Sequence, residues 1–476
     1  MIALPKFSQL NPKTVAKELD ELLQIHRQQL DKLLKQKQFT WQNLFVPMQA
    51  MSNELSKSWG PIGHINSVLN TADWREAYNQ CLPILTIYFT ELGQNKALYA
   101  AIQSIKDGEK FDQLDAVQQK IITDDLRDFL LAGVTLEGEK KQRYAEIQQR
   151  MSELTTKFEE NVLDATQAWH FHGEDDTSLK GLPEHTVALA KATAQEKDLK
   201  GYVLSLDVPC YLSVMKYADD SQLREKFYEA FVTRASDKGP NAGEFDNSNV
   251  MVDILKLREE SSQLLGFENY AQYSLATKMA ESSNQVVIFL EDLLAKSKAF
   301  AEKEFIELKK FAQEDLNLSD LHAWDLAYVS EKLQHAKYSI NQEMLRPYFP
   351  EDKVFEGMFE VIKRIYGMQV EEVKSFDSWH EQVRLFKISD EEDSVRGYFY
   401  ADLYARAQKR GGAWMDDLQG RFIAENEQVQ TPVAFLTCNF NKPVGDQPAL
   451  LTHDDVVTLF HEFGHTLHHL MTQVDY

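Results

Sequence analysis

The residues best suited to chemistry lie together near the end of the chain, at His461, Glu462 and His465. They form the pattern His-Glu-x-x-His within the stretch TLFHEFGHTLHHL, residues 458 to 470. On a helix, residues four apart share one face, so two neutral imidazoles can bind one Zn²⁺ ion. The carboxylate between them is offset by about 100°, which places it beside the ion, where it can take a proton from water. The pattern therefore predicts a metal-dependent hydrolytic site with two histidine ligands and a glutamate general base.

An amphipathic helix is expected to carry these residues. Thr452 followed by Asp455 three places on predicts a capping box at its start. One apolar stripe recurs at helical spacing and comprises Val456, Phe460, Phe463, Leu467 and Leu470. The two histidines fall nearly opposite that stripe, so the helix is expected to pack by one face and present the histidines from another. The alternative is that they form the exposed polar face of an ordinary helix.

A catalytic zinc site normally takes three protein ligands, and the sequence offers no clear third one. His468 shares the face of His461 but lies seven residues away, which is about 10.5 Å along the axis. Zinc–nitrogen bonds are only about 2.0–2.1 Å long. His468 and His469 are therefore expected to support the site or pack beside it. Asp475 is the one carboxylate side chain after His465.

Composition bounds the class of protein. A chain of 476 residues is too long for one compact core, so two or three domains are expected. The net charge of −23 disfavours nucleic acid as a partner. No apolar run approaches the roughly 20 residues that a membrane span needs, and the first residues lack the features of a signal peptide. Three separated cysteines fit a reducing compartment, so the cytoplasm is expected, while the oligomeric state stays open.

Periodicity indicates a mainly α protein with small β elements. Helical patterns fill the first 150 residues and return from about 219 to 375. Runs rich in aromatic and β-branched residues predict short strands at 167–173, 201–208, 395–405 and 431–440. The predicted organisation is an N-terminal helical domain (1–150), a connecting segment with short strands (151–210), and the N-terminal portion of a catalytic domain that ends just after the metal helix (211–476).

Several blocks of sequence carry a family resemblance. LLTHDDVVTLFHEFGHTLHHL resembles the active-site helix of the M3 family of zinc oligopeptidases, the thimet oligopeptidase and neurolysin family. GYFYADLYARAQKRGGAWMDD (397–417) and TPVAFLTCNFNKP (431–443) are similar to the same family, and weaker likeness reaches the N-terminus. The resemblance implies a zincin-type peptidase with two lobes that face across a deep, narrow channel. It also implies hydrolysis of short, unstructured peptides.

The resemblance gives roles to individual residues. It implies that His461 and His465 bind one Zn²⁺ per chain and that Glu462 is the general base. The family's third ligand is a glutamate on the following helix, which would lie beyond Tyr476, so the chain resembles a C-terminally incomplete member. Two functions follow as alternatives. One is a zinc metalloendopeptidase of short peptides, and the other is a catalytically inactive fragment that acts as a peptide-binding or inert helical scaffold.

Three further expectations concern the surroundings of the site. The strand at 395–405 or the one at 431–440 either pairs with the backbone of a peptide substrate or forms the core of the sheet. Asp402, Tyr404 and Arg406 are expected to have structural roles. The apolar stripe between residues 456 and 470 is expected to lack part of its partners, which predicts exposed apolar surface and a tendency to associate.

Overall fold

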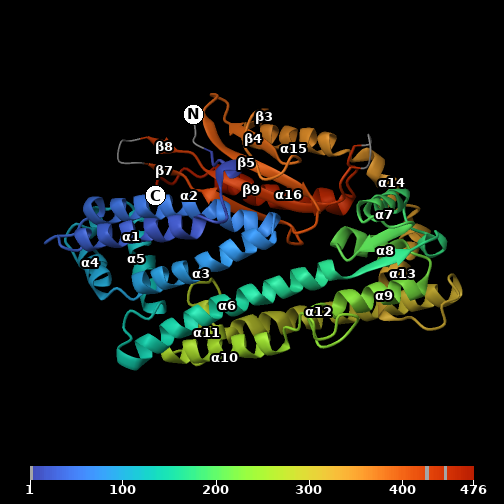
Figure 1. Ribbon diagram of the computed structural model, residues 1–476, viewed down its shortest axis with the longest axis horizontal. Coiled ribbons are helices and arrows are strands. Elements are labelled where there is room, and N and C mark those ends of the chain that lie inside the picture. Colours follow the sequence, from blue (N-terminus) through green and yellow to red (C-terminus); the bar gives the residue numbers. More distant parts are fainter. Residues whose placement is uncertain (1–3, 424–427, 444–447) are drawn as a thin grey trace.

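The computed structural model describes residues 4–423, 428–443 and 448–476. Within them the chain is mainly helical, with one five-stranded sheet and two two-stranded sheets. The large sheet lies along one side of the molecule and the longest helices lie along the opposite side (Figure 1). The predicted fold class, mainly α with small β elements, is therefore confirmed. None of the helices in these residues is long and apolar enough to cross a membrane.

The first part of the chain is helical, as predicted. Its α-helices are α1 (Val15–Leu33), α2 (Val46–Val68), α3 (Ala72–Gly93), α4 (Lys96–Lys106), α5 (Ala116–Leu131) and α6 (Gly138–Ala168). The side chains of Thr71, Asn95 and Asp115 cap three of them by accepting hydrogen bonds from first-turn N–H groups. These caps satisfy donors that a helix cannot satisfy itself. The division of the chain into three parts, at residues 150/151 and 210/211, remains a prediction.

The middle of the chain returns to helix after two short strands. β1 (His170–Gly173) and β2 (Tyr202–Ser205) pair antiparallel, which confirms the strands predicted at 167–173 and 201–208. The helices that follow β1 are α7 (Glu184–Glu196), α8 (Val208–Tyr217), α9 (Ser221–Val232), α10 (Ser248–Leu264), α11 (Tyr270–Leu275), α12 (Ser283–Glu314), α13 (Leu326–Tyr338), α14 (Gln342–Leu345) and α15 (Glu351–Tyr366). Short 3₁₀ or π turns are η1 (Phe7–Gln9), η2 (Trp41–Phe45), η3 (Phe111–Gln113), η4 (Thr177–Leu179), η5 (Ala323–Asp325) and η6 (Arg346–Tyr348).

The large sheet has the strand order β3-β4-β5-β9-β6. Its strands are β3 (Gln369–Val373), β4 (Arg384–Ser389), β5 (Val395–Tyr404), β6 (Trp414–Gln419) and β9 (Val433–Phe440), and the small hairpin is β7 (Phe422–Ile423) with β8 (Val429–Gln430). β5 and β9 run parallel, and the other neighbours run antiparallel. The strands predicted at 395–405 and 431–440 are therefore confirmed.

Strand order decides which strands offer a free edge. β5 lies between β4 and β9, and β9 lies between β5 and β6, so both are internal. The expectation that one of these two strands pairs with a substrate backbone is wrong, and the sheet-core alternative holds. In the described residues, β6 has a strand neighbour on one side only. A peptide could therefore add to the sheet along β6.

The last helix, α16 (His453–Leu470), packs on one face of this sheet. Leu459, Phe463, Leu467 and Leu470 are buried in one core with residues of β5 and β9. The predicted stripe is off by one residue at one place, because Phe460 is 38% exposed and Leu459 is fully buried instead. The chain's own sheet thus covers most of the stripe, and the expected exposed apolar surface on residues 456–470 is limited to Val457, which is 55% exposed, and Phe460.

Exposed apolar side chains gather on α12 instead. Of its 32 residues, only Ala312 is buried. Large apolar residues more than 40% exposed on this helix are Val287, Ile288, Phe289, Leu290, Leu293, Leu294, Phe300, Phe305 and Ile306. An exposed apolar surface of this size is unusual for a monomeric protein.

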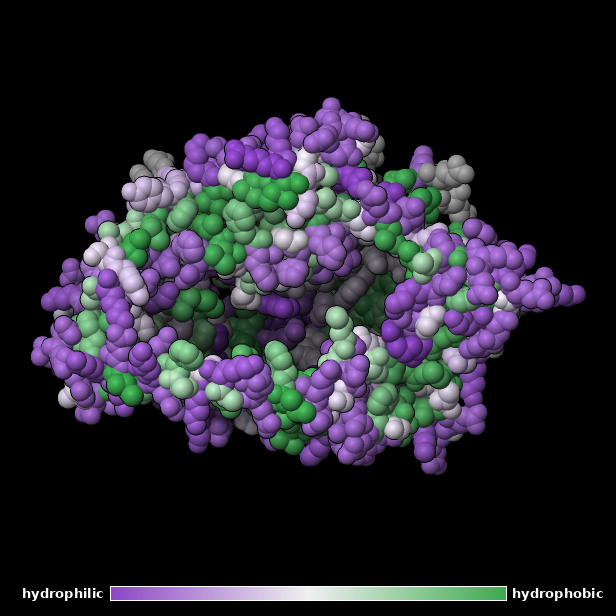
Figure 2. Space-filling view, turned by 180° about the vertical axis from the view of Figure 1, so that it is seen from behind, coloured by the Kyte–Doolittle hydropathy of each residue, from purple (hydrophilic) through white to green (hydrophobic). Residues whose placement is uncertain are grey.

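The molecule is hollowed between the sheet side and the long-helix side. Figure 2 shows a deep hollow near the centre of one face. A cavity of about 380 Å³ lies between the two sides, lined by residues such as Asn66 of α2, Glu159 of α6 and Pro209 of α8, and by the loop after β5. This arrangement agrees with the two lobes and the channel between them that the family resemblance implies.

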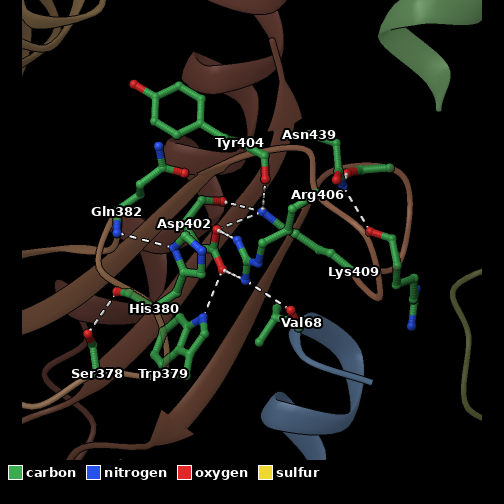
Figure 3. A network of polar contacts seen from close by, with 12 residues as sticks. Val68, Ser378, Trp379, His380, Gln382, Asp402, Tyr404, Arg406, Lys409 and Asn439 are labelled. Carbon is green, nitrogen blue, oxygen red and sulfur yellow. Dashed lines mark hydrogen bonds and ion pairs between the residues drawn. The ribbon is translucent and has the colours of Figure 1, made fainter. Parts of the chain in front are cut away.

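A buried ionic cluster joins α2 to the sheet (Figure 3). Asp402 of β5 is 3% exposed and accepts hydrogen bonds from Arg406 at 2.6 and 2.7 Å, from Lys409 at 2.7 Å and from Trp379 at 2.8 Å. Arg406 also donates to the Val68 carbonyl at the end of α2, at 2.9 Å. Burial opposes ionisation of Asp402, but the hydrogen bonds from Arg406 and the charge of Lys409 outweigh it and hold its pKa well below the ordinary value.

His64 of α2 is buried beside this cluster, where it is 2% exposed. Its ring stacks on Phe435 with the centroids 3.7 Å apart, and neither ring nitrogen has a hydrogen-bond partner among the described residues. Burial lowers the pKa of His64 from 6.5 to about 3. It outweighs the negative charge of Asp402, which acts to raise this pKa, and the cations Lys409 and Arg406 lower it further. The folded protein therefore keeps this imidazole neutral.

The buried imidazole predicts an acid sensitivity. Between pH 6.5 and about 3, the unfolded chain binds a proton at His64 that the folded chain does not. The free energy of unfolding should fall as the pH decreases through this window, by as much as roughly 4 kcal/mol from this residue. Urea denaturation of the wild type and of His64→Phe at several pH values tests this. The variant should show a shallower loss, and parallel curves for the two proteins would contradict the assignment.

Candidate functional site

The start of α16 is fixed by its own first turn. Thr452 Oγ1 accepts a hydrogen bond from the Asp455 N–H at 3.0 Å, and Asp455 Oδ2 accepts one from the Thr452 N–H at 2.8 Å. The predicted capping box is therefore confirmed. Asp454 and Asp455 also lie at the positive end of the helix dipole, where negative charge is stabilising.

The two histidines of the motif lie side by side on the exposed face of α16. The Nε2 atoms of His461 and His465 are 3.3 Å apart, and both residues are exposed. Two nitrogens that bind one tetrahedral zinc ion at about 2.0–2.1 Å would be about 3.3–3.4 Å apart. The imidazole pair therefore fits a zinc ion with little rearrangement.

Glu462 lies beside this pair but turns inward. It is 9% exposed, and its carboxylate has no hydrogen-bond partner within the described part of the chain. The hydrogen bond that Thr466 Oγ1 donates, at 3.0 Å, goes to the main-chain carbonyl of Glu462 and not to its carboxylate. A Cβ added at Gly464 would meet nothing within 4 Å, so the space above the motif is open.

Glu462 and His465 line a cleft of about 750 Å³ between α16 and β6. Met415 and Asp417 of β6 form the facing wall, and His468, His469 and Tyr476 complete that end. His469 Nε2 lies 3.1 Å from the Gln419 carbonyl, so it connects α16 to the end of β6. This contact agrees with the supporting role expected for His469, and His468 is exposed in the cleft.

The structure brings the three predicted site residues together, but it adds no third metal ligand from the residues it describes. In residues 4–423, 428–443 and 448–476, no group of three or more His, Cys, Asp or Glu side chains is arranged to hold a metal ion. The facing wall, β6, is the part of the site that the sequence did not predict, because no strand was expected between residues 405 and 431. Trp414 is the one residue of β6 whose type is enriched in strands, and Asp416 and Asp417 are of a type that is depleted in them.

The sequence and the fold of this chain were compared with those of known protein families and solved structures. Residues 214–476 match the family model described as "Peptidase family M3", and residues 19–141 match "Neurolysin/Thimet oligopeptidase, N-terminal domain". A putative oligoendopeptidase F from Bacillus anthracis has a similar fold, with a TM-score of 0.50 at 16% identity over 94% of this chain and 64% of that one.

Curated relatives are more similar in sequence. Oligopeptidase A of Haemophilus influenzae is 48% identical and that of Escherichia coli 49% identical, over 99% of this chain. The chain spans 69% and 70% of the lengths of these two relatives. An organellar oligopeptidase A of Arabidopsis thaliana is 34% identical over 99% of this chain and 61% of its own length. On the extent of these matches, the chain belongs to peptidase family M3.

Proposed function

We propose that this chain is a zinc metalloendopeptidase that hydrolyses short, unstructured peptides. One zinc ion per chain would be held by His461 and His465, with Glu462 as the general base. The observation that carries the proposal is the 3.3 Å separation of the two Nε2 atoms on an exposed helix face, next to Glu462, whose carboxylate has no hydrogen-bond partner among the described residues and which lines the cleft. The membership of family M3 supports the same chemistry.

The roles of the residues follow from where they lie. Bound zinc would supply Lewis-acid chemistry, acting on a water molecule and on the scissile carbonyl. Glu462 lines the cleft and has no competing hydrogen bond, so its carboxylate can accept a proton from water and return it to the leaving amine. His465 lies on the same wall of the cleft, and its side chain is exposed to the cleft.

Substrate binding is assigned to β6. This strand has a free edge among the described residues and faces α16 across the cleft. An extended peptide can add to such an edge through main-chain hydrogen bonds, which selects for unfolded segments more than for a particular sequence. The hollow between the lobes supports the same preference, because a thin chain enters it more easily than a folded domain does.

The second candidate is the one stated from the sequence, a protein that binds peptides without cutting them. It predicts peptide binding with no cleavage at any zinc concentration. The cytoplasm remains the proposed compartment. The three cysteines form no disulfide, and burial raises the pKa of the Cys81 thiol to about 11, which suits a reducing environment.

Zinc affinity tests the proposed ligands. His461→Ala and His465→Ala should each weaken zinc binding by at least about 100-fold, because each removes one of the two imidazoles. His468→Ala is the matched control, since it removes an exposed imidazole from the same helix. Competition with a chromophoric chelator measures the affinities, and circular dichroism checks that α16 stays folded. An equal loss in His468→Ala would point to a different ligand pair.

A further inference from the structure

The two walls of the catalytic cleft differ in charge and in origin. One wall is α16, which presents Glu462 and the imidazoles of His465, His468 and His469, and the other is β6, which presents Met415 and Asp417. Glu462 is a carboxylate that is nine-tenths buried and lacks a hydrogen-bond partner among the described residues. Because Glu462 lines the cleft and its carboxylate has no protein partner there, the carboxylate is available to a ligand bound in the cleft.

The register of the sheet decides which side chains of β6 face the cleft. Asp417 lies opposite Ala434 of β9, and Ala434 belongs to the core that packs under α16. Asp416 lies opposite Phe435, which belongs to the core on the other face of the sheet. Directly opposed residues of an antiparallel pair point to the same face. Asp417 therefore projects toward the cleft, whereas Asp416 projects away from it.

The charge of Asp417 is not neutralised by its neighbours. The residue is exposed, and within the described residues its carboxylate has no ion pair. Arg421, the one arginine or lysine on the cleft walls in those residues, is engaged with Asp475 at 2.7 Å. The remaining ionisable side chains of the walls are Glu462, the imidazoles and Tyr476. The wall along β6 is thus open to a cation.

We propose that Asp417 is a specificity-determining residue that makes the cleft prefer peptides carrying a lysine or arginine side chain opposite it. This inference rests on the proposed function, because it takes β6 as the peptide-binding edge. A peptide added along β6 places alternate side chains on the face that Asp417 shares, and opposite charges directly across a strand pair are stabilising. The net charge of −23 attracts cationic peptides in general, but it does not select a position along the peptide.

Binding to the metal-free chain tests the proposal without any cleavage. The probes are fluorescein-labelled, alanine-rich peptides of ten residues. Each peptide carries a single lysine, glutamine or glutamate, and the position of that residue is varied along the peptide. Fluorescence anisotropy gives the Kd of each peptide. At the position that crosses Asp417, the lysine peptide should bind up to about five-fold more tightly than the glutamine peptide, and the glutamate peptide correspondingly more weakly. Added salt should reduce the difference.

Two variants assign the preference to its residue. Asp417→Asn should abolish the preference at that position, whereas Asp416→Asn, which removes the same charge from the other face of the same strand, should keep it. Equal preferences in the wild type and Asp417→Asn would overturn the proposal, as would equal losses in both variants or no binding of any peptide.

Cleavage assays with the zinc-loaded chain distinguish a failure of this inference from a failure of the proposed function on which it rests. Hydrolysis of quenched peptides with no Asp417-dependent preference would overturn the specificity assignment alone. A preference that depends on Asp417, in a chain that never cleaves, would contradict the proposed peptidase activity and leave the binding inference standing.

Discussion

Replacing Asp402 with asparagine is expected to destabilise the protein by about 3–5 kcal/mol. The wild-type carboxylate is 3% exposed and receives hydrogen bonds from Arg406, Lys409 and Trp379. The amide keeps the shape but not the charge, so two cations lose their counter-charge in a place where water cannot replace it. Lys409 is most affected, because its side chain is fully buried and burial already lowers its pKa to about 8.

The loss should extend beyond the strand that carries Asp402. The cluster fixes the loop after β5 to the end of α2, where Arg410 N–H donates to the Ser67 carbonyl at 2.8 Å and Asn70 N–H to the Gln408 carbonyl at 2.9 Å. Urea denaturation followed by circular dichroism measures the change. Asp416→Asn is the control, since this exposed aspartate should change stability by no more than about 0.5 kcal/mol. A similar small effect in Asp402→Asn would show that the ionic cluster contributes little.

The helix that carries the His-Glu-x-x-His motif was predictable from sequence because its determinants are local. Thr452 and Asp455 lie three residues apart and complete a cap within one turn. The spacing of His461 and His465 needs only the helical repeat to bring the two rings together. Which side chains of the helix are buried depends on tertiary packing. Leu459 and Phe460 are adjacent and both apolar, and only the position of the sheet decides that Leu459 is buried.

The facing wall of the cleft could not be predicted in the same way. β6 follows two glycines and contains two adjacent aspartates, which have low strand propensity. It becomes a strand because β9 supplies its partner, from residues about 20 positions later in the chain. Whether a strand is internal or at an edge depends on the whole strand order. For this reason the sequence indicated β5 and β9 as strands but left open whether they pair with a substrate or form the core of the sheet, and the strand order decides for the core.

Replacing Glu462 with glutamine has the largest expected effect on function. Glutamine has nearly the same shape, so it should leave the packing of α16 and the zinc affinity of His461 and His465 close to those of the wild type. It cannot accept a proton from water at neutral pH, and general-base catalysis typically contributes about 10²–10⁴-fold to the rate. We expect kcat to fall by this factor with little change in KM, because the side chain lies at the cleft wall where the base is needed.

The proposed peptidase activity and the role of Glu462 are tested together by the rates at which zinc-loaded wild type and Glu462→Gln hydrolyse an internally quenched peptide, with zinc per chain determined in the same samples. We expect one zinc in both proteins, turnover by the wild type, and a loss of at least about 100-fold in the variant. Equal rates in the two proteins would contradict the role of Glu462. Wild type that holds its zinc and cleaves nothing would contradict the proposed activity and favour a peptide-binding protein.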